Sequence, residues 1–139
     1  MRNLWILLVL IAFSLVPSVG ADPQDLQVVK LRAYAGEDMP RQAFVEVQVK
    51  NRGSAAESGA ILVVTLTPAP VDRNRLEARD SYTPVELEQE IGTLQPGEAR
   101  TFRVETPFGA TDGFTSRTGQ FSGQRGQEEL SIRFQADIR

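Results

Sequence analysis

The sequence predicts an all-β fold made of antiparallel strands, and three patterns support this prediction. Residues 45–50 alternate between valine and polar side chains, with Val45, Val47 and Val49 on one face, as in a half-buried strand. A second alternating run has its apolar positions at Leu130, Ile132, Phe134, Ala136 and Ile138. No sustained helical period occurs, and glycine and proline residues separate the apolar runs. Short strands divided by such turns are typical of a sandwich or barrel.

The N-terminal residues 1–21 predict a secretory signal peptide. A short positive start that contains Arg2 precedes an apolar run over residues 4–16, and small residues follow around Ala21. The apolar run is shorter than the roughly 18 residues that a membrane-spanning helix needs. We therefore expect a signal peptide helix at 1–21 and one β-domain at 22–139, with no stable membrane insertion after cleavage. A retained membrane anchor is the alternative.

The first two strands of the domain are expected at residues 26–35 and 43–51. In the first, the apolar alternation changes phase at Val28 and Val29, which predicts a β-bulge there. A turn rich in small residues follows the second, and its Gly53 is suited to a positive φ.

The third strand is expected at residues 61–66. This run is nearly all apolar, as in a central strand covered on both sides, and Pro68 and Pro70 are expected to end it. The polar segment 71–82 is either an irregular loop or a short edge strand, which would be a seventh strand.

Two further strands are expected at residues 85–91 and around residues 102–105. Between them, the Pro96-Gly97 pair has the order that a type II turn favours. Residues 107–127, with five glycines at 109, 113, 119, 123 and 126, are expected to form a long loop before the last strand.

Composition excludes several classes of function. The chain has 139 residues, a net charge of −3, no histidine and no cysteine. Because its charges are interspersed, no basic stripe is available for nucleic acid. The usual ligands of zinc, copper and haem are absent, so we expect no metal and no cofactor. Catalytic triads based on histidine are impossible, and the alternating Glu86, Glu88 and Glu90 have the pattern of a solvated strand, so we expect no enzyme activity.

The runs VEVQVKNRGSAAESGAILVVTL and IGTLQPGEARTFRVETP, with FQAD in the last strand, resemble the CARDB-type (cell-adhesion-related) immunoglobulin-like domains of bacterial exported proteins. The matching positions are Val45, Val47, Val49, Asn51, Gly53, Ala56, Leu66, Ile91, Leu94, Pro96, Gly97 and Phe102. The resemblance implies an antiparallel immunoglobulin-like or fibronectin-like β-sandwich of six to seven strands. It also implies an adhesion, spacer or accessory role. The segments 71–82 and 107–127 depart from the family pattern.

The segment 107–127 supplies the first candidate binding residues. It carries Phe108, Phe114 and Phe121 among glycine, polar residues and Arg117, and aromatic anchors on a polar loop are typical of binding loops. The alternative is that these phenylalanines close the open end of the core.

The charged segment 71–82 supplies the second set of candidates. Arg73 and Arg75 lie beside acidic residues and would form an electrostatic contact patch. The alternative is a solvated loop whose charges pair locally for little energy.

Loop order suggests where a partner would bind. In a six-stranded antiparallel order, successive loops alternate between the two ends, which places 36–41, 68–82 and 107–127 together. The turns 51–59 and 92–98 would lie at the opposite end. We therefore expect an exported, non-catalytic accessory module, periplasmic or secreted from a bacterium. It would contact another envelope or surface protein through its long loops or a strand edge. A carbohydrate- or small-ligand-binding module is the alternative, and the oligomeric state is left open.

Overall fold

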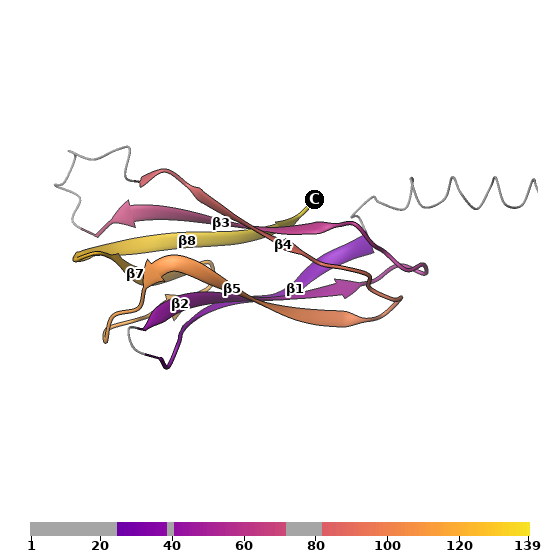
Figure 1. The fold of residues 1–139 in the computed structure, drawn as a ribbon, viewed down its shortest axis with the longest axis horizontal. Helices are drawn as coiled ribbons and strands as arrows, with labels where there is room; N and C mark the ends of the chain where they lie inside the picture. The colour runs from indigo at the N-terminus through magenta and orange to yellow at the C-terminus, as the bar shows by residue number, and fades with distance from the viewer. Residues whose placement is uncertain (1–24, 39–40, 72–81) are drawn as a thin grey trace, which may run out of the picture.

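The computed structural model describes residues 25–38, 41–71 and 82–139, which form an all-β chain without an α-helix in those ranges. Its elements are β1 (Leu26–Ala35), β2 (Gln42–Asn51), β3 (Ile61–Pro70), β4 (Val85–Glu90), β5 (Ala99–Gly109), β6 (Ser116–Arg117), β7 (Gln120–Arg125) and β8 (Glu128–Ile138) (Figure 1). The predicted all-β antiparallel class is confirmed. The expected signal peptide helix at 1–21 and the possible strand at 71–82 fall mainly outside the described residues.

All eight strands belong to one antiparallel hydrogen-bonded sheet, in the order β1-β2-β5-β7-β8-β3-β4, with β6 paired to β7. The link between β5 and β7 is a single residue pair, Gly109 and Gln124. Figure 1 shows β3, β4 and β8 along one side of the molecule and β1, β2 and β5 along the other. The sheet is thus divided into two strand groups that are joined at one point.

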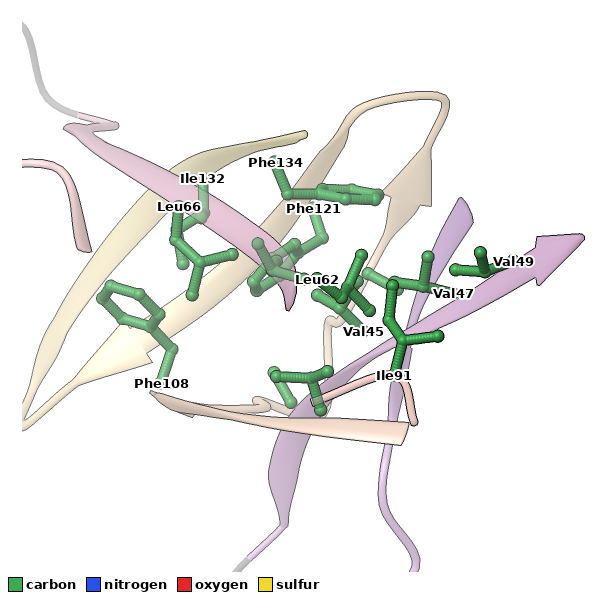
Figure 2. Close-up of a cluster of buried hydrophobic side chains, with 14 of the residues drawn as sticks. Val45, Val47, Val49, Leu62, Leu66, Ile91, Phe108, Phe121, Ile132 and Phe134 are labelled. Atoms are coloured by element: carbon green, nitrogen blue, oxygen red, sulfur yellow. The ribbon is translucent and has the colours of Figure 1, made fainter. Parts of the chain in front are cut away.

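The core lies between these strand groups. Val45, Val47 and Val49 of β2 are completely buried, and Val45 lies opposite Val104 of β5. Figure 2 shows these valines in one cluster with Leu62 and with residues of β7 and β8. The predicted alternation of β2 and β8 is therefore confirmed, because apolar side chains at every second position reach a common interior.

The predicted β-bulge in β1 is also confirmed. The register of β1 against β2 shifts between Val28 and Lys30. After the shift, Ala33 lies opposite the buried Val45, while Arg32 and Tyr34 alternate with it on the outer face. The bulge therefore decides which β1 side chains face solvent.

β3 is central as predicted, but its prolines do not end it. β3 lies between β4 and β8 over residues 61–66, and it continues along β8 through Pro68 and Pro70. Beyond Leu66, β8 is the strand that pairs with β3 in the described part of the chain. A residue without an N–H is tolerated there because only one neighbouring strand needs hydrogen bonds.

The prediction of a long loop over residues 107–127 was wrong. This segment contains strands, so the described residues form eight strands where six to seven were expected. β5 extends to Gly109, and this segment also holds β6 and β7. Gly123 makes this packing possible, because a Cβ there would lie 3.3 Å from Phe108 Cβ and closer still to Ile132. The glycines that suggested a loop therefore include one that lets strands approach closely.

The turn before β5 and the turn after β2 use glycine in different ways. The turn before β5 has Gly97 at a φ of +79°, and Glu98 N–H donates to Gln95 C=O over 3.0 Å, as a type II turn predicts. Gly53 does not have a positive φ, contrary to the conformation expected for it. There a Cβ would lie 2.7 Å from Asp25 Oδ2, so Gly53 allows a close approach instead.

Acidification should destabilise the domain partly through Glu98. Its carboxylate accepts hydrogen bonds from Gln95 N–H and Arg100 Nη2, both over 2.9 Å, and these bonds lower the pKa of Glu98 below 4.5. Just below pH 4.5 the unfolded state therefore binds more protons, so stability falls as the pH falls towards the folded pKa. We expect Glu98→Gln to flatten the dependence of Tm on pH in that window.

The matched control is Glu88→Gln on β4. The Glu88 side chain is exposed and makes no hydrogen bond or ion pair among the described residues. A melting series in which both variants flatten the pH profile equally would contradict the assignment to Glu98.

Candidate functional site

Two loop segments predicted to share one end of the molecule do lie together. Ala110 N–H donates to Arg41 C=O over 3.0 Å, and Arg41 Nε donates to Gly36 C=O over 3.1 Å. Val71, the last described residue before 82, lines one cavity with Thr111 and residues next to it. The segment after β5 and the β1–β2 connection therefore form one surface.

The short turns form the opposite end, as predicted. Asn51 N–H donates to Glu98 C=O over 2.9 Å, and Glu57 and Leu94 exchange two backbone hydrogen bonds of 2.9 Å. Asp25 C=O also accepts from Arg52 N–H over 2.8 Å, so β1 begins at this end. The predicted end is thus confirmed for the two short turns, for the β1–β2 connection and for the residues directly after β5, whereas most of 68–82 lies outside the described residues and the rest of 107–127 is not a loop.

The surface formed by the long connections contains an open groove of about 520 Å³, hereafter the loop-end groove. Its lining residues are Arg41, Gln42, Pro107, Gly109, Ala110, Thr111, Asp112, Gln124, Arg125 and Gly126. It combines two arginines, one aspartate and the backbone of a strand end, and its lining among the described residues includes no aromatic side chain. The groove is therefore suited to polar and charged contacts rather than to stacking on a ring.

Two of the predicted binding residues belong to the core. Phe108 is completely buried in β5, and Phe121 is 2 % exposed in β7. The Phe121 ring lies 5.9 Å from Phe114 and 5.7 Å from Phe134, centroid to centroid. Phe114 is partly buried against the same cluster. This arrangement fits the alternative in which the phenylalanines close one end of the core.

Of the remaining candidates, the structure describes only Arg117. Arg117 is exposed in β6 and lines a small cavity of about 160 Å³ beside Phe121 and Ser131, which shares no lining residue with the loop-end groove. Arg73 and Arg75 lie outside the described residues. Among the described candidates, Phe108 and Phe121 are therefore core residues and Arg117 is exposed, so these residues do not form a loop of exposed aromatic anchors.

A side-chain cluster on the outer face of β1, β2 and β5 was not predicted as a site. It consists of Arg32, Tyr34, Phe44, Glu46 and Arg103, hereafter the arginine–aromatic cluster. The Tyr34 and Phe44 rings stack with centroids 5.6 Å apart. Arg103 Cζ lies 3.8 Å from the Phe44 centroid, and Arg32 Cζ lies 5.1 Å from the Tyr34 centroid. The one indication of this cluster in the sequence is Phe44, an apolar residue on the otherwise polar face of its strand.

An ion pair anchors one side of this cluster. Arg32 donates to both carboxylate oxygens of Glu46, over 2.9 Å from Nε and 3.2 Å from Nη2. These hydrogen bonds lower the pKa of Glu46 and raise the pKa of Arg32. Because Arg32 is exposed, the pair contributes little to stability, but it holds Glu46 ionised and directed towards Arg32.

Comparison with known proteins does not assign a family. No family model matches the sequence, and no curated protein matches it. Within the described ranges, no helix has the length and apolar character to cross a bilayer, and no group of three or more acidic residues could hold a metal ion.

Proposed function

We propose that this chain is an exported, non-catalytic binding module of the bacterial envelope, periplasmic or secreted. It uses an immunoglobulin-like β-sandwich of the CARDB type to contact another envelope or surface protein. The two strand groups and the core between them support the sandwich. The sequence resemblance supports the family, and the segment 1–21 supports export.

The loop-end groove is the observation that carries the proposed protein contact. Connections far apart in sequence, around residues 41, 110 and 125, form one polar concavity on a rigid sheet. Loops held by a rigid scaffold are where binding residues concentrate. Its mixture of Arg41, Asp112 and strand-end backbone groups matches the mixed polar and charged surface of a partner protein.

The other routes have less support. β4 is an edge strand of the described sheet, but Glu86, Glu88 and Glu90 are exposed along it, and like charges on an edge discourage pairing with another strand. The carbohydrate-binding alternative needs exposed aromatic platforms. Of the candidate platforms, Phe121 is buried, and Phe114 and Tyr82 are partly buried against the core, so none of the three has a fully exposed ring.

Site-specific crosslinking tests the proposal in intact cells. A photo-reactive residue replaces Thr111 in the loop-end groove of the full chain, and the matched variant carries it at Gln95 in the opposite turn. We expect a discrete adduct with one envelope protein from position 111 and none from position 95. Cell fractionation of the same strains tests export.

A charge reversal then tests whether the groove itself recognises the partner. Asp112→Arg should weaken the position-111 adduct by about tenfold or more, because it changes the charge inside the contact. Asp137→Arg on β8 is the control on a distant strand face. Equal adduct yields from position 111 and position 95, or an adduct unaffected by Asp112→Arg, would exclude the groove as the contact.

A further inference from the structure

The arginine–aromatic cluster holds one guanidinium that is positioned by rings but not paired with an acid. Arg103 Cζ lies 3.8 Å from the Phe44 centroid and 5.6 Å from the Tyr34 centroid. Among the described residues, Arg103 makes no salt bridge and no side-chain hydrogen bond. Contact with the ring faces restricts the rotamers of its side chain, and the N–H groups of the guanidinium are available to an acceptor.

The nearest acidic neighbour across the strands is already engaged. Glu46 lies opposite Arg32 on one side and opposite Arg103 on the other. Both of its oxygens accept hydrogen bonds from Arg32. The central row of this face is therefore arginine, glutamate, arginine, with only the first arginine paired.

The face as a whole is more basic than the chain. Its outward positions on β1, β2 and β5 carry the basic residues Lys30, Arg32, Lys50 and Arg103 and the acidic residues Glu46 and Glu105. The chain nevertheless has a net charge of −3. The outer face of β3, β4 and β8 shows the reverse balance, with Glu86, Glu88, Glu90 and Asp137 against Arg133 and Arg139. A local positive field in an acidic protein attracts anionic groups selectively.

We infer that this face binds an acidic protein segment, in which the carboxylate of an aspartate or glutamate side chain accepts hydrogen bonds from Arg103. A planar guanidinium accommodates both oxygens of a carboxylate. Neighbouring strands are about 4.8 Å apart, so Arg32 and Arg103 flank Glu46 at a spacing that several side chains of one extended segment can follow. The arginines cover the faces of Tyr34 and Phe44, which leaves those rings unsuited to stacking on a sugar.

This inference is separate from the proposed groove. The arginine–aromatic cluster shares no residue with the lining of the loop-end groove. The two surfaces can therefore be inactivated independently, and failure of one binding test leaves the other unaffected.

Peptide titration tests the inference on the purified full chain. The probe is a fluorescent hexaglutamate peptide, followed by anisotropy at low salt, with hexalysine as the charge-reversed control. Arg103→Ala should weaken hexaglutamate binding by about tenfold, since it removes the unpaired guanidinium. Arg103→Lys retains the charge but not the planar fork, so it should also weaken binding. Arg133→Ala on the opposite face should change it by less than about twofold.

Five results would overturn the inference, of which four come from the binding measurements. These four are no saturable binding of hexaglutamate, equal weakening by Arg103→Ala and Arg133→Ala, unchanged affinity in Arg103→Ala, and binding of polygalacturonate without binding of hexaglutamate. Self-association that disappears in Arg103→Ala, without peptide binding, would make a second copy the occupant and would equally exclude the acidic segment. Melting curves check that each variant is folded. Because Arg103 is exposed, we expect both Arg103 variants to melt like the wild type.

Discussion

Val47→Asp should leave the purified protein largely unfolded at room temperature. Val47 is completely buried in the middle of β2, opposite Phe102 and Leu31, and belongs to the central cluster in Figure 2. A carboxylate at this position would lack both water and a cationic partner, which costs more than about 4 kcal/mol. Domains of this size have a total stability of only about 5–15 kcal/mol.

The matched control introduces the same residue on the other side of the sheet. Thr101 on β5 is exposed and lies opposite Gln48, one position along β2 from Val47. Thr101→Asp should therefore retain a cooperative transition and a Tm close to that of the wild type. Circular dichroism and thermal melting make the comparison. Similar losses in the two variants would mean that the two strand faces have been assigned wrongly.

Asn51→Ala should reduce the free energy of unfolding by about 2–3 kcal/mol, because its amide is the centre of a buried hydrogen-bond network. Asn51 is completely buried. Its Nδ2 donates to Ala55 C=O over 2.8 Å and to Leu94 C=O over 3.0 Å, while its Oδ1 accepts from Gly53 N–H over 2.9 Å. Alanine would leave these backbone groups short of partners.

Asn51→Asp separates hydrogen bonding from side-chain size. The aspartate retains an acceptor for Gly53 N–H but directs a second oxygen at the carbonyls of Ala55 and Leu94. It should be at least as destabilising as alanine at neutral pH. Ser54→Ala, an exposed change in the same turn, should shift the urea midpoint little. Wild-type stability in Asn51→Asp would contradict the role of the amide.

Strands with one buried face could be predicted because alternation records burial directly. β2 and β8 have this pattern, and the bulge in β1 was visible as a change of phase. β7 could not be predicted in this way because one of its buried positions is Gly123, which has no side chain to complete the apolar alternation. Side chains of neighbouring strands fill the space at this position. The prediction that Pro68 and Pro70 end the third strand was wrong for a related reason. Whether a proline ends a strand depends on which strands pair with it, and the sequence does not show that β8 alone pairs with this part of β3 in the described residues.

The candidate sites were predicted less well, because they depend on pairing between distant segments. The loop order placed residues 41 and 110 at one end correctly, but sequence did not indicate which side chains line the groove. The phenylalanines at 108 and 121 were ambiguous until their strands were known. Arg103 meets Tyr34 and Phe44 only through the registers of two strand pairs, and neither register can be read from composition.

The position of β8 has a consequence for how the chain is made. β8 is hydrogen-bonded to both β7 and β3, yet it follows every other strand in the sequence. During synthesis, the apolar β3 therefore lacks one neighbouring strand until residues 128–138 have emerged. Contacts between such distant segments form slowly, and the exposed apolar strand is prone to aggregate in the meantime. The native core should thus form only after β8 is available, so folding of this chain is completed by its last strand.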